Sequence, residues 1–173
     1  MRLRTRGRWG VQAGILAGMA VAAVFFVADL ARTTPLSTPL FFSQTILHGA
    51  GFALGGDGMV QTLAGFSPGG RLALFTALHL SLFAVLGVLA GGMANLFHVR
   101  WSWRTGGIAG LAVGLLVWLM VSRIGTAWLA AAGLTLPVFV GAAIVGGAVL
   151  GWHLRLCHID EEEIPSRARA ASL

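Results

Sequence analysis

Four long apolar runs constrain the fold of this chain more than any other feature. They cover roughly residues 10–31, 71–97, 106–128 and 134–153, and each is close to the length of about 20 residues that a helix needs to cross a bilayer. A backbone surrounded by lipid must satisfy its own hydrogen bonds, so runs of this length are expected to be helical. The sequence therefore predicts an all-α, polytopic membrane protein with four transmembrane helices.

Composition excludes an ordinary soluble domain. Hydrophobic residues make up 57% of the 173 residues and charged residues only 10%, whereas soluble domains carry about 25% charged residues. The net charge of +6 comes from arginines at the ends of the apolar runs, not from a basic stripe. The lipid bilayer is therefore the expected partner, and nucleic acid is not. The single cysteine, Cys157, excludes an internal disulfide.

The chain divides into a basic N-terminus at 1–9, a four-span domain at 10–153 with an external loop at 32–70, and a tail at 154–173. The first run is too long for a secretory signal and is followed by no convincing cleavage site, so we expect a retained helix. Within the loop, the half-apolar segment 40–54 is short for a span. It fits an interfacial or re-entrant helix between spans one and two.

Arginine distribution predicts the orientation of the chain. With four spans both termini share one side, and that side holds nine of the arginines while the other holds three. The nine are Arg2, Arg4, Arg6, Arg8, Arg100, Arg104, Arg155, Arg167 and Arg169. Because cytoplasmic segments carry the excess of basic residues, we expect a bacterial inner-membrane protein with both termini in the cytoplasm.

Two sequence patterns indicate a possible parallel repeat of two helices. Spans two and four end on the same pattern of Gly-Gly, five residues, His, one residue and Arg, at 91–100 and 146–155. Spans one and three carry glycine at every fourth position. These helix-packing glycines are Gly10, Gly14 and Gly18 in span one, and Gly106, Gly110 and Gly114 in span three.

Glycines four residues apart line one helix face and allow a neighbouring backbone to approach closely. The glycine rows therefore favour spans one and three as the central contact pair, and the two halves would be related by an axis along the membrane normal. The alternative is that small residues are simply common in membrane helices.

Ionisable residues inside a membrane are costly and so indicate candidate sites. Asp29, Arg71 and Arg123 fall at the outer ends of spans one, two and three and would form a polar cluster in which Asp29 pairs with either arginine. One interpretation is an interfacial ion pair with arginines that reach the headgroups. The other is an outward-facing pocket for a small anion or a quinone-type headgroup, with His79 about 12 Å below Arg71 at its floor.

His79, His98 and His153 are the candidate cofactor ligands. His98 and His153 occupy matched positions in the repeated pattern, so they could hold a haem or a metal with the adjacent Arg100 and Arg155 near the propionates. The alternative is that each histidine belongs to a basic anchor at the membrane edge. No spaced Cys/His array indicates a structural metal site, and no nucleotide or hydrolase motif is present.

Three short segments, Val27–Leu30, Pro35–Pro39 and Thr76–His79, resemble a pattern in four-helix bacterial membrane proteins of no assigned activity. The likeness covers the first half of the chain. It implies a four-span inner-membrane protein and favours a specific role for Asp29 and His79.

The sequence contains no group of residues that is typical of an active site. It therefore favours a non-enzymatic membrane protein, an accessory or packing subunit bound to other membrane subunits. Two alternatives remain. One is a haem-binding subunit for electron transfer, and the other is a small-solute transporter that acts as a homo-oligomer. The sequence identifies no particular cofactor.

Overall fold

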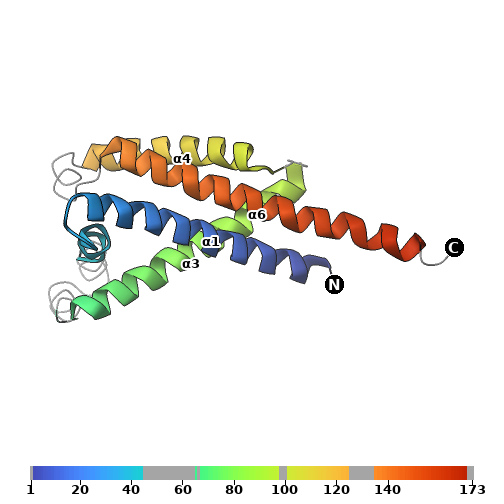
Figure 1. Cartoon of the computed structure of the whole chain (residues 1–173), viewed down its shortest axis with the longest axis horizontal. Helices are drawn as coiled ribbons and strands as arrows, with labels where there is room; N and C mark the ends of the chain where they lie inside the picture. The colour runs from blue at the N-terminus through green and yellow to red at the C-terminus, as the bar shows by residue number, and fades with distance from the viewer. Residues whose placement is uncertain (1, 45–64, 66, 98–100, 125–134, 171–173) are drawn as a thin grey trace.

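Every element of the structure, a computed structural model that describes residues 2–44, 65, 67–97, 101–124 and 135–170, is helical. The long helices are α1 (Arg2–Ala31), α3 (Pro68–Phe97), α4 (Trp103–Ile124) and α6 (Leu136–Ala170), and a short helix lies at 37–44 (Figure 1). The four long helices each contain a stretch apolar and long enough to cross a membrane. The prediction of an all-α chain with four such helices is confirmed for this part of the sequence.

Local capping explains where α3 and α4 begin. Ser67 accepts a hydrogen bond from the amide of Gly70 at 3.2 Å, and Pro68 occupies the first helical position, where its missing N–H costs nothing. Ser102 and Thr105 cap the start of α4 with two reciprocal hydrogen bonds. The Ser102 amide donates to Thr105 Oγ1 at 2.8 Å, and the Thr105 amide donates to Ser102 Oγ at 3.2 Å. This reciprocal arrangement is a capping box.

The helix α6 is longer than the span predicted at 134–153. It has 35 residues, about 52 Å at helical rise, which exceeds the hydrocarbon core of about 30 Å. Its C-terminal part extends beyond the other helices (Figure 1). The tail therefore begins as a continuation of the last helix. The end of the predicted third span and the start of the fourth, at 125–134, lie outside the described residues, as does the loop at 45–64.

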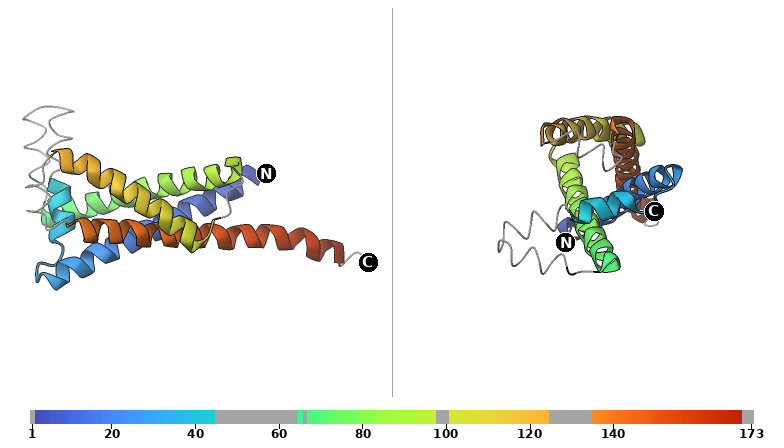
Figure 2. Two further views of the ribbon diagram at one scale, coloured as in Figure 1. Left: turned by 90° about the horizontal axis from the view of Figure 1, so that it is seen from above. Right: turned by 90° about the vertical axis from the view of Figure 1, so that its left-hand side faces the viewer.

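The four long helices pack side by side in a row instead of forming a closed bundle. The main contacts are α1 with α3, α1 with α6, and α4 with α6, so α1 and α6 form the central pair (Figure 2). The expectation that the spans at 10–31 and 106–128 form that pair was wrong. Each glycine row packs instead against the next long helix of its own half of the chain.

Glycine is required where the two hairpins cross. A Cβ added at Gly87 of α3 would lie 2.8 Å from the Cα of Gly14 in α1, and one added at Gly147 of α6 would lie 2.8 Å from the Cα of Gly110 in α4. Real Cβ atoms do not approach so closely, so each hairpin is held by contacts between backbones that only glycine permits.

Small residues occupy the interior of the molecule, and large apolar residues lie outside. Among the described residues, the buried apolar side chains are Ala13, Ala17, Val21, Ala142 and Leu154. Leu96, Ile108 and Val27, by contrast, are 72%, 67% and 64% exposed. Water would penalise such an exterior heavily, whereas lipid would not.

Candidate functional site

Asp29 is the best-bound ionisable side chain at the loop end of the helices. It is completely buried, and its carboxylate accepts hydrogen bonds from the Thr38 amide at 2.8 Å and from the Thr38 hydroxyl at 2.6 Å. The guanidinium of Arg32 lies 3.9 Å from the same carboxylate. Asp29 therefore joins the end of α1 to the start of the helix at 37–44.

The chain reverses sharply between these two helices. Thr33 and Leu36 have positive φ angles of 60° and 64°, which are uncommon for residues with a Cβ. The amides of Arg32 and Thr34 both donate to the Asp29 carbonyl, at 3.1 and 3.0 Å. The Asp29 carboxylate thus caps a helix that begins after this turn, where exposed amides and the helix dipole favour a negative charge.

Arg71 and Arg123 do not join Asp29 in the structure. Arg71 lies in the first turn of α3, and its Nε atom is buried without a hydrogen-bond partner among the described residues. Arg123 lies exposed in the last turn of α4. Among the described residues, the groups near the Asp29 carboxylate are Thr38 and Arg32. Neither Thr38 nor Arg32 was predicted from the sequence as a partner of Asp29. The spacing of three between Asp29 and Arg32 is nevertheless typical of a pair on one helix face.

His79 connects two helices near the middle of the predicted spans. Its Nε2 atom lies 3.1 Å from the carbonyl oxygen of Gly18 in α1. A carbonyl oxygen can only accept a hydrogen bond, so Nε2 is the protonated nitrogen in this contact. His79 lies eight residues after Arg71 on the same helix. It is a polar link between α1 and α3, of the kind that joins helices in membranes.

An aromatic row surrounds His79. On α3 its ring packs against Phe75 at 5.7 Å and Phe83 at 4.8 Å between centroids. Phe75 in turn stacks on Phe42 of the helix at 37–44, at 6.1 Å and an interplanar angle of 10°. The row therefore leads from the capped turn at Asp29 into the middle of α3. The spacing of four between the α3 aromatics was the signal in the sequence for this face.

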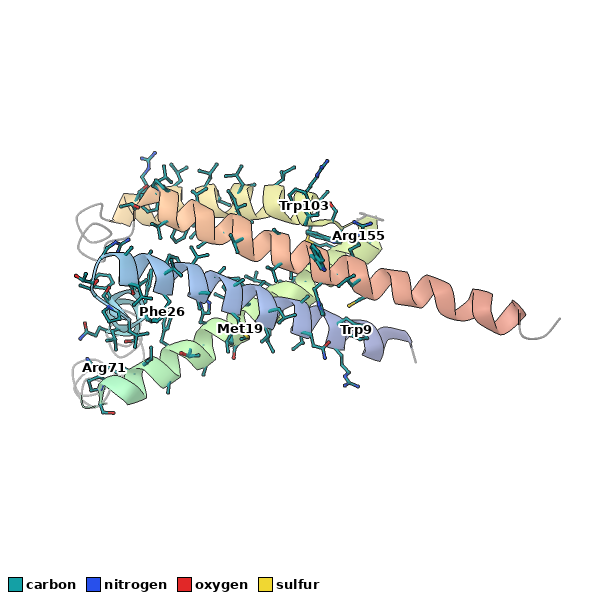
Figure 3. The ribbon with its side chains drawn as sticks, in the orientation of Figure 1. Trp9, Met19, Phe26, Arg71, Trp103 and Arg155 are labelled. Atoms are coloured by element: carbon teal, nitrogen blue, oxygen red, sulfur yellow. The ribbon has the colours of Figure 1, made fainter. Side chains whose placement is uncertain are left out.

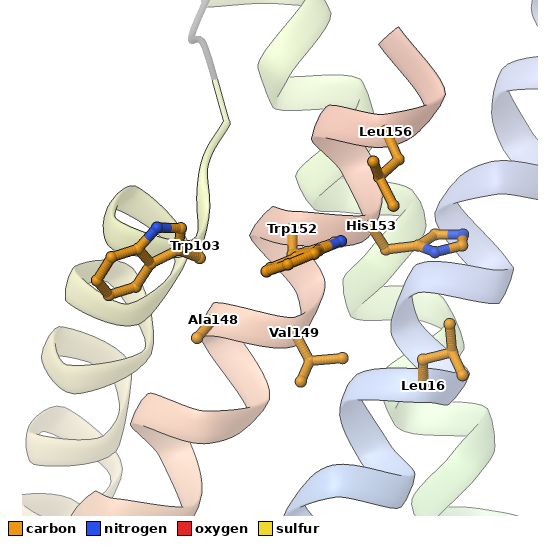
Figure 4. A pocket seen from close by; sticks show the side chains of 7 residues that line it. All are labelled: Leu16, Trp103, Ala148, Val149, Trp152, His153 and Leu156. Atoms are coloured by element: carbon orange, nitrogen blue, oxygen red, sulfur yellow. The ribbon is translucent and has the colours of Figure 1, made fainter. Parts of the chain in front are cut away.

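His153 lies at the other end of the molecule, on the side of both termini. It lines a pocket of about 570 Å³ together with Leu16, Trp103, Ala148, Val149, Trp152 and Leu156. Figure 3 places Trp103 and Arg155 at this end, near Trp9, and Figure 4 shows Trp152 between Trp103 of α4 and His153 on the side toward α1. The His153 ring is 6.4 Å from that of Trp9, and its Nε2 atom is buried without a hydrogen-bond partner among the described residues.

The structure separates His79 from His153, and His98 lies outside the described residues. The helices α3 and α6 both begin at the loop end. With a rise of about 1.5 Å per residue, His79 lies about 16 Å from the start of α3, and His153 lies about 26 Å from the start of α6. Consistent with this, His79 contacts Gly18 of α1 whereas His153 packs on Trp9, nine residues or about 13 Å earlier on the same helix. Among the described residues, no group of three His, Cys, Asp or Glu side chains could hold a metal ion.

Comparison of the chain with protein-family models, with curated proteins and with solved structures found no significant match. The resemblance of the first half of the chain to four-helix bacterial membrane proteins stays a prediction. The features that bear on function are therefore the packing of the helices and the three sites around Asp29, His79 and His153.

Proposed function

We propose that this chain is a four-span integral membrane protein that acts as a packing subunit of a larger membrane complex. One observation carries the proposal. Only 6% of the span of α3 and 11% of the span of α4 are buried within the chain, against 28% for α1, because most contacts of each are with one long helix. Helices of other subunits would cover the remaining faces of α3 and α4.

Membrane helices associate through close packing and interhelical hydrogen bonds, because lipid supplies no hydrophobic drive between them. A row of helices with both outer members largely uncovered forms few such contacts. Leu82 and Leu89 on α3, and Ile108 and Met120 on α4, expose more than half of their surface. Partner helices would add the packing that the row itself lacks.

The proposed membrane is the bacterial inner membrane, with both termini cytoplasmic. Trp9, Trp103 and Trp152 are exposed. Trp9 and Trp103 lie at the end of the helices where the termini lie (Figure 3), and Trp152 lies near Trp103 (Figure 4), as expected for an aromatic belt at a membrane interface. The excess of arginines on the same side supports the cytoplasmic assignment.

We further propose that the two hairpins are copies of one unit. Both halves cross on glycine contacts, which supports a parallel repeat. Their registers differ, however. Gly106 meets Gly147, whereas its counterpart Gly10 meets Gly87 rather than Gly92, the counterpart of Gly147. The second helix of one half is therefore shifted by five residues relative to the other, roughly one and a half turns.

Site-specific photo-crosslinking in the native membrane tests the packing role. A crosslinking residue at Leu82 on α3 or Met120 on α4 should yield discrete protein adducts that mass spectrometry can identify. The control position is Val27, which is equally exposed but lies on α1, the helix that two neighbours already cover. Protein adducts absent from Leu82 and Met120, or equal at all three positions, would contradict the proposal. Adducts of the chain with itself would favour the homo-oligomeric transporter instead.

Haem binding is a second candidate, favoured by one observation. His153 lines an apolar pocket, and its Nε2 atom is buried without a hydrogen-bond partner among the described residues. A neutral imidazole nitrogen is a common iron ligand. Arg155 follows closely on α6 and could meet a propionate. A reduced-minus-oxidised spectrum of the purified protein without haem bands would exclude this function.

A further inference from the structure

The helix α3 has its main contacts with one long helix only. Among the described long helices that neighbour is α1, whereas α6 has main contacts with both α1 and α4. The views in Figure 2 accordingly place α3 beside the central pair of α1 and α6. A movement of α3 along its own axis would therefore disturb chiefly one interface between long helices, the interface with α1.

The glycines of α1 and α3 repeat with the spacing of one helical turn. Gly87 packs between Gly10 and Gly14, and a Cβ added to Gly87 would lie 2.8 Å from the Gly14 Cα. Gly91 follows four residues later on the same face of α3. A Cβ on Gly91 would make only ordinary contacts, at 3.9 Å from the Gly10 Cα and 3.8 Å from a methyl group of Leu154. The structure therefore gives no steric reason for a glycine at position 91.

The other hairpin makes close contacts through both of its corresponding glycines. A Cβ at Gly147 of α6 would lie 2.8 Å from the Gly110 Cα, and one at Gly151 would lie 2.9 Å from the Gly106 Cα. The pair of α4 and α6 is therefore already packed on two successive glycines of the second helix. The pair of α1 and α3 would be packed in the same way if α3 moved by one turn toward the loop end.

Aromatic and polar contacts of α3 repeat with the same spacing. Phe75 and His79 are four residues apart on α3, and Phe42 of the helix at 37–44 stacks on Phe75. His79 Nε2 donates to the Gly18 carbonyl of α1. A movement of one turn would bring His79 to the present place of Phe75 beside Phe42, and would bring its Nε2 atom to the carbonyl of Ala22, one turn after Gly18. Each contact would be replaced by one of the same kind.

We propose that α3 has a second stable position on α1, one helical turn, or about 6 Å, closer to the loop end. In this position Gly91 packs between Gly10 and Gly14, and Gly87 packs between Gly14 and Gly18. Intermediate positions would press the side chains of α3 against the backbone of α1, so the helix has two discrete positions. Movements of one turn past a packed neighbour are one of the ways in which proteins switch.

The movement couples the two ends of the molecule. The helix α3 is continuous over its 30 residues, so its first turn, which carries Arg71, and its last turn move by the same distance. A ligand or partner helix that binds one position better than the other shifts the balance between them. This device goes beyond the packing role proposed above and does not rest on it.

Disulfide trapping tests for the second position, because it accumulates even a minor state. Ala22→Cys on α1 is combined with Leu80→Cys on α3, in a chain whose own cysteine is removed by Cys157→Ser. In the structure Leu80 packs beside Gly18, with its Cδ2 atom 3.3 Å from a Cβ added there, and is thus one turn away from Ala22. The second position brings the two cysteines together, and a disulfide requires Cβ atoms about 3.5–4.5 Å apart. Mild oxidation in membranes should therefore protect both thiols of the monomer from a maleimide.

A second variant distinguishes the proposed movement from general mobility. The Cβ of Gly91→Ala fits the position seen in the structure, but in the second position it would meet the helix backbone between Gly10 and Gly14. The rate of disulfide formation should therefore fall about tenfold or more. Gly92→Ala is the matched control, because a Cβ at Gly92 meets nothing within 4 Å, and it should leave the rate unchanged. An unchanged melting curve verifies that Gly91→Ala remains folded.

Three outcomes would overturn the proposal. The first is that no disulfide forms between positions 22 and 80 within the monomer. The second is that the disulfide forms equally fast with Gly91→Ala, because loose packing of α3 would then explain it. The third is that Gly92→Ala slows the reaction as much as Gly91→Ala, because a stiffer helix and not a blocked position would then be the cause.

Discussion

Asp29 is the residue whose buried charge has the clearest structural reason. A carboxylate can be buried only where hydrogen bonds or opposite charges replace its water. Two bonds from Thr38 do this, and Arg32 adds a more distant positive charge. The result fixes the direction in which the chain leaves α1. His79 has an analogous role between α1 and α3, where its bond to the Gly18 carbonyl satisfies a polar ring inside the predicted span.

Removing the Asp29 carboxylate should destabilise the protein. Asp29→Ala leaves the amide and hydroxyl of Thr38 buried without an acceptor, which should lower the free energy of unfolding by about 2–3 kcal/mol. Asp29→Asn keeps one acceptor oxygen and should cost less. Arg32→Gln is the control, because its guanidinium is 31% exposed and 3.9 Å away, and such pairs contribute little. Thermal unfolding in detergent measures all three, and equal losses for Asp29→Ala and Arg32→Gln would rule out the capping role.

At the scale of elements, the hairpins depend on glycines at their crossing points. In soluble proteins large apolar side chains hold helices together, but here the contact surfaces are backbone and small side chains. The glycines of the chain are nevertheless not equivalent. Gly14 and Gly147 face a neighbouring backbone, whereas a Cβ at Gly92 or Gly141 would meet nothing within 4 Å.

Alanine substitution should separate these two groups of glycines. Gly14→Ala and Gly147→Ala place a Cβ against a helix backbone and should each destabilise the protein by about 1–3 kcal/mol. Gly92→Ala and Gly141→Ala should be neutral or stabilise it by up to about 1 kcal/mol, because alanine favours a helix over glycine. Melting temperatures of the four variants in one detergent provide the comparison. Losses at Gly92 and Gly141 equal to those at Gly14 and Gly147 would refute the assigned crossings.

At the scale of the whole molecule, the open row of helices controls what the protein presents to its surroundings. The faces of α3 and α4 are available to lipid or partner helices. The Asp29 turn lies at the loop end of the helices, and the His153 pocket lies toward the end that carries the termini. If the chain crosses a membrane, these two sites face opposite leaflets. The predicted orientation assigns the pocket to the cytoplasmic side and the turn to the outer side.

Reporter fusions test that orientation. A fluorescent protein that matures only in the cytoplasm should be active after Leu173 and inactive when inserted at Gly58 in the loop. Alkaline phosphatase, which is active only outside the cytoplasm, should give the opposite pattern at the same two positions. Phosphatase activity after Leu173 would reverse the orientation, and equal activities at both positions would argue against an even number of spans.

Sequence alone determined the class of the fold and the approximate places of the four long helices. Both properties are local, since helix formation in an apolar run depends on neighbouring residues and on the length of the run. The crossing glycines were also visible in the sequence, because their spacing of four is a property of one helix.

Tertiary structure decided which helices meet and which polar groups pair. The long helices are apolar on most sides, so their sequences do not specify which face meets which neighbour. Asp29 was singled out from the sequence, but its partner Thr38 depends on a turn with two positive φ angles. Likewise, no local pattern joins His79 to Gly18, 61 residues away, or brings Leu16, Trp103 and His153 around one pocket. Such contacts depend on how the helices cross, and that geometry is set by close packing over the whole chain.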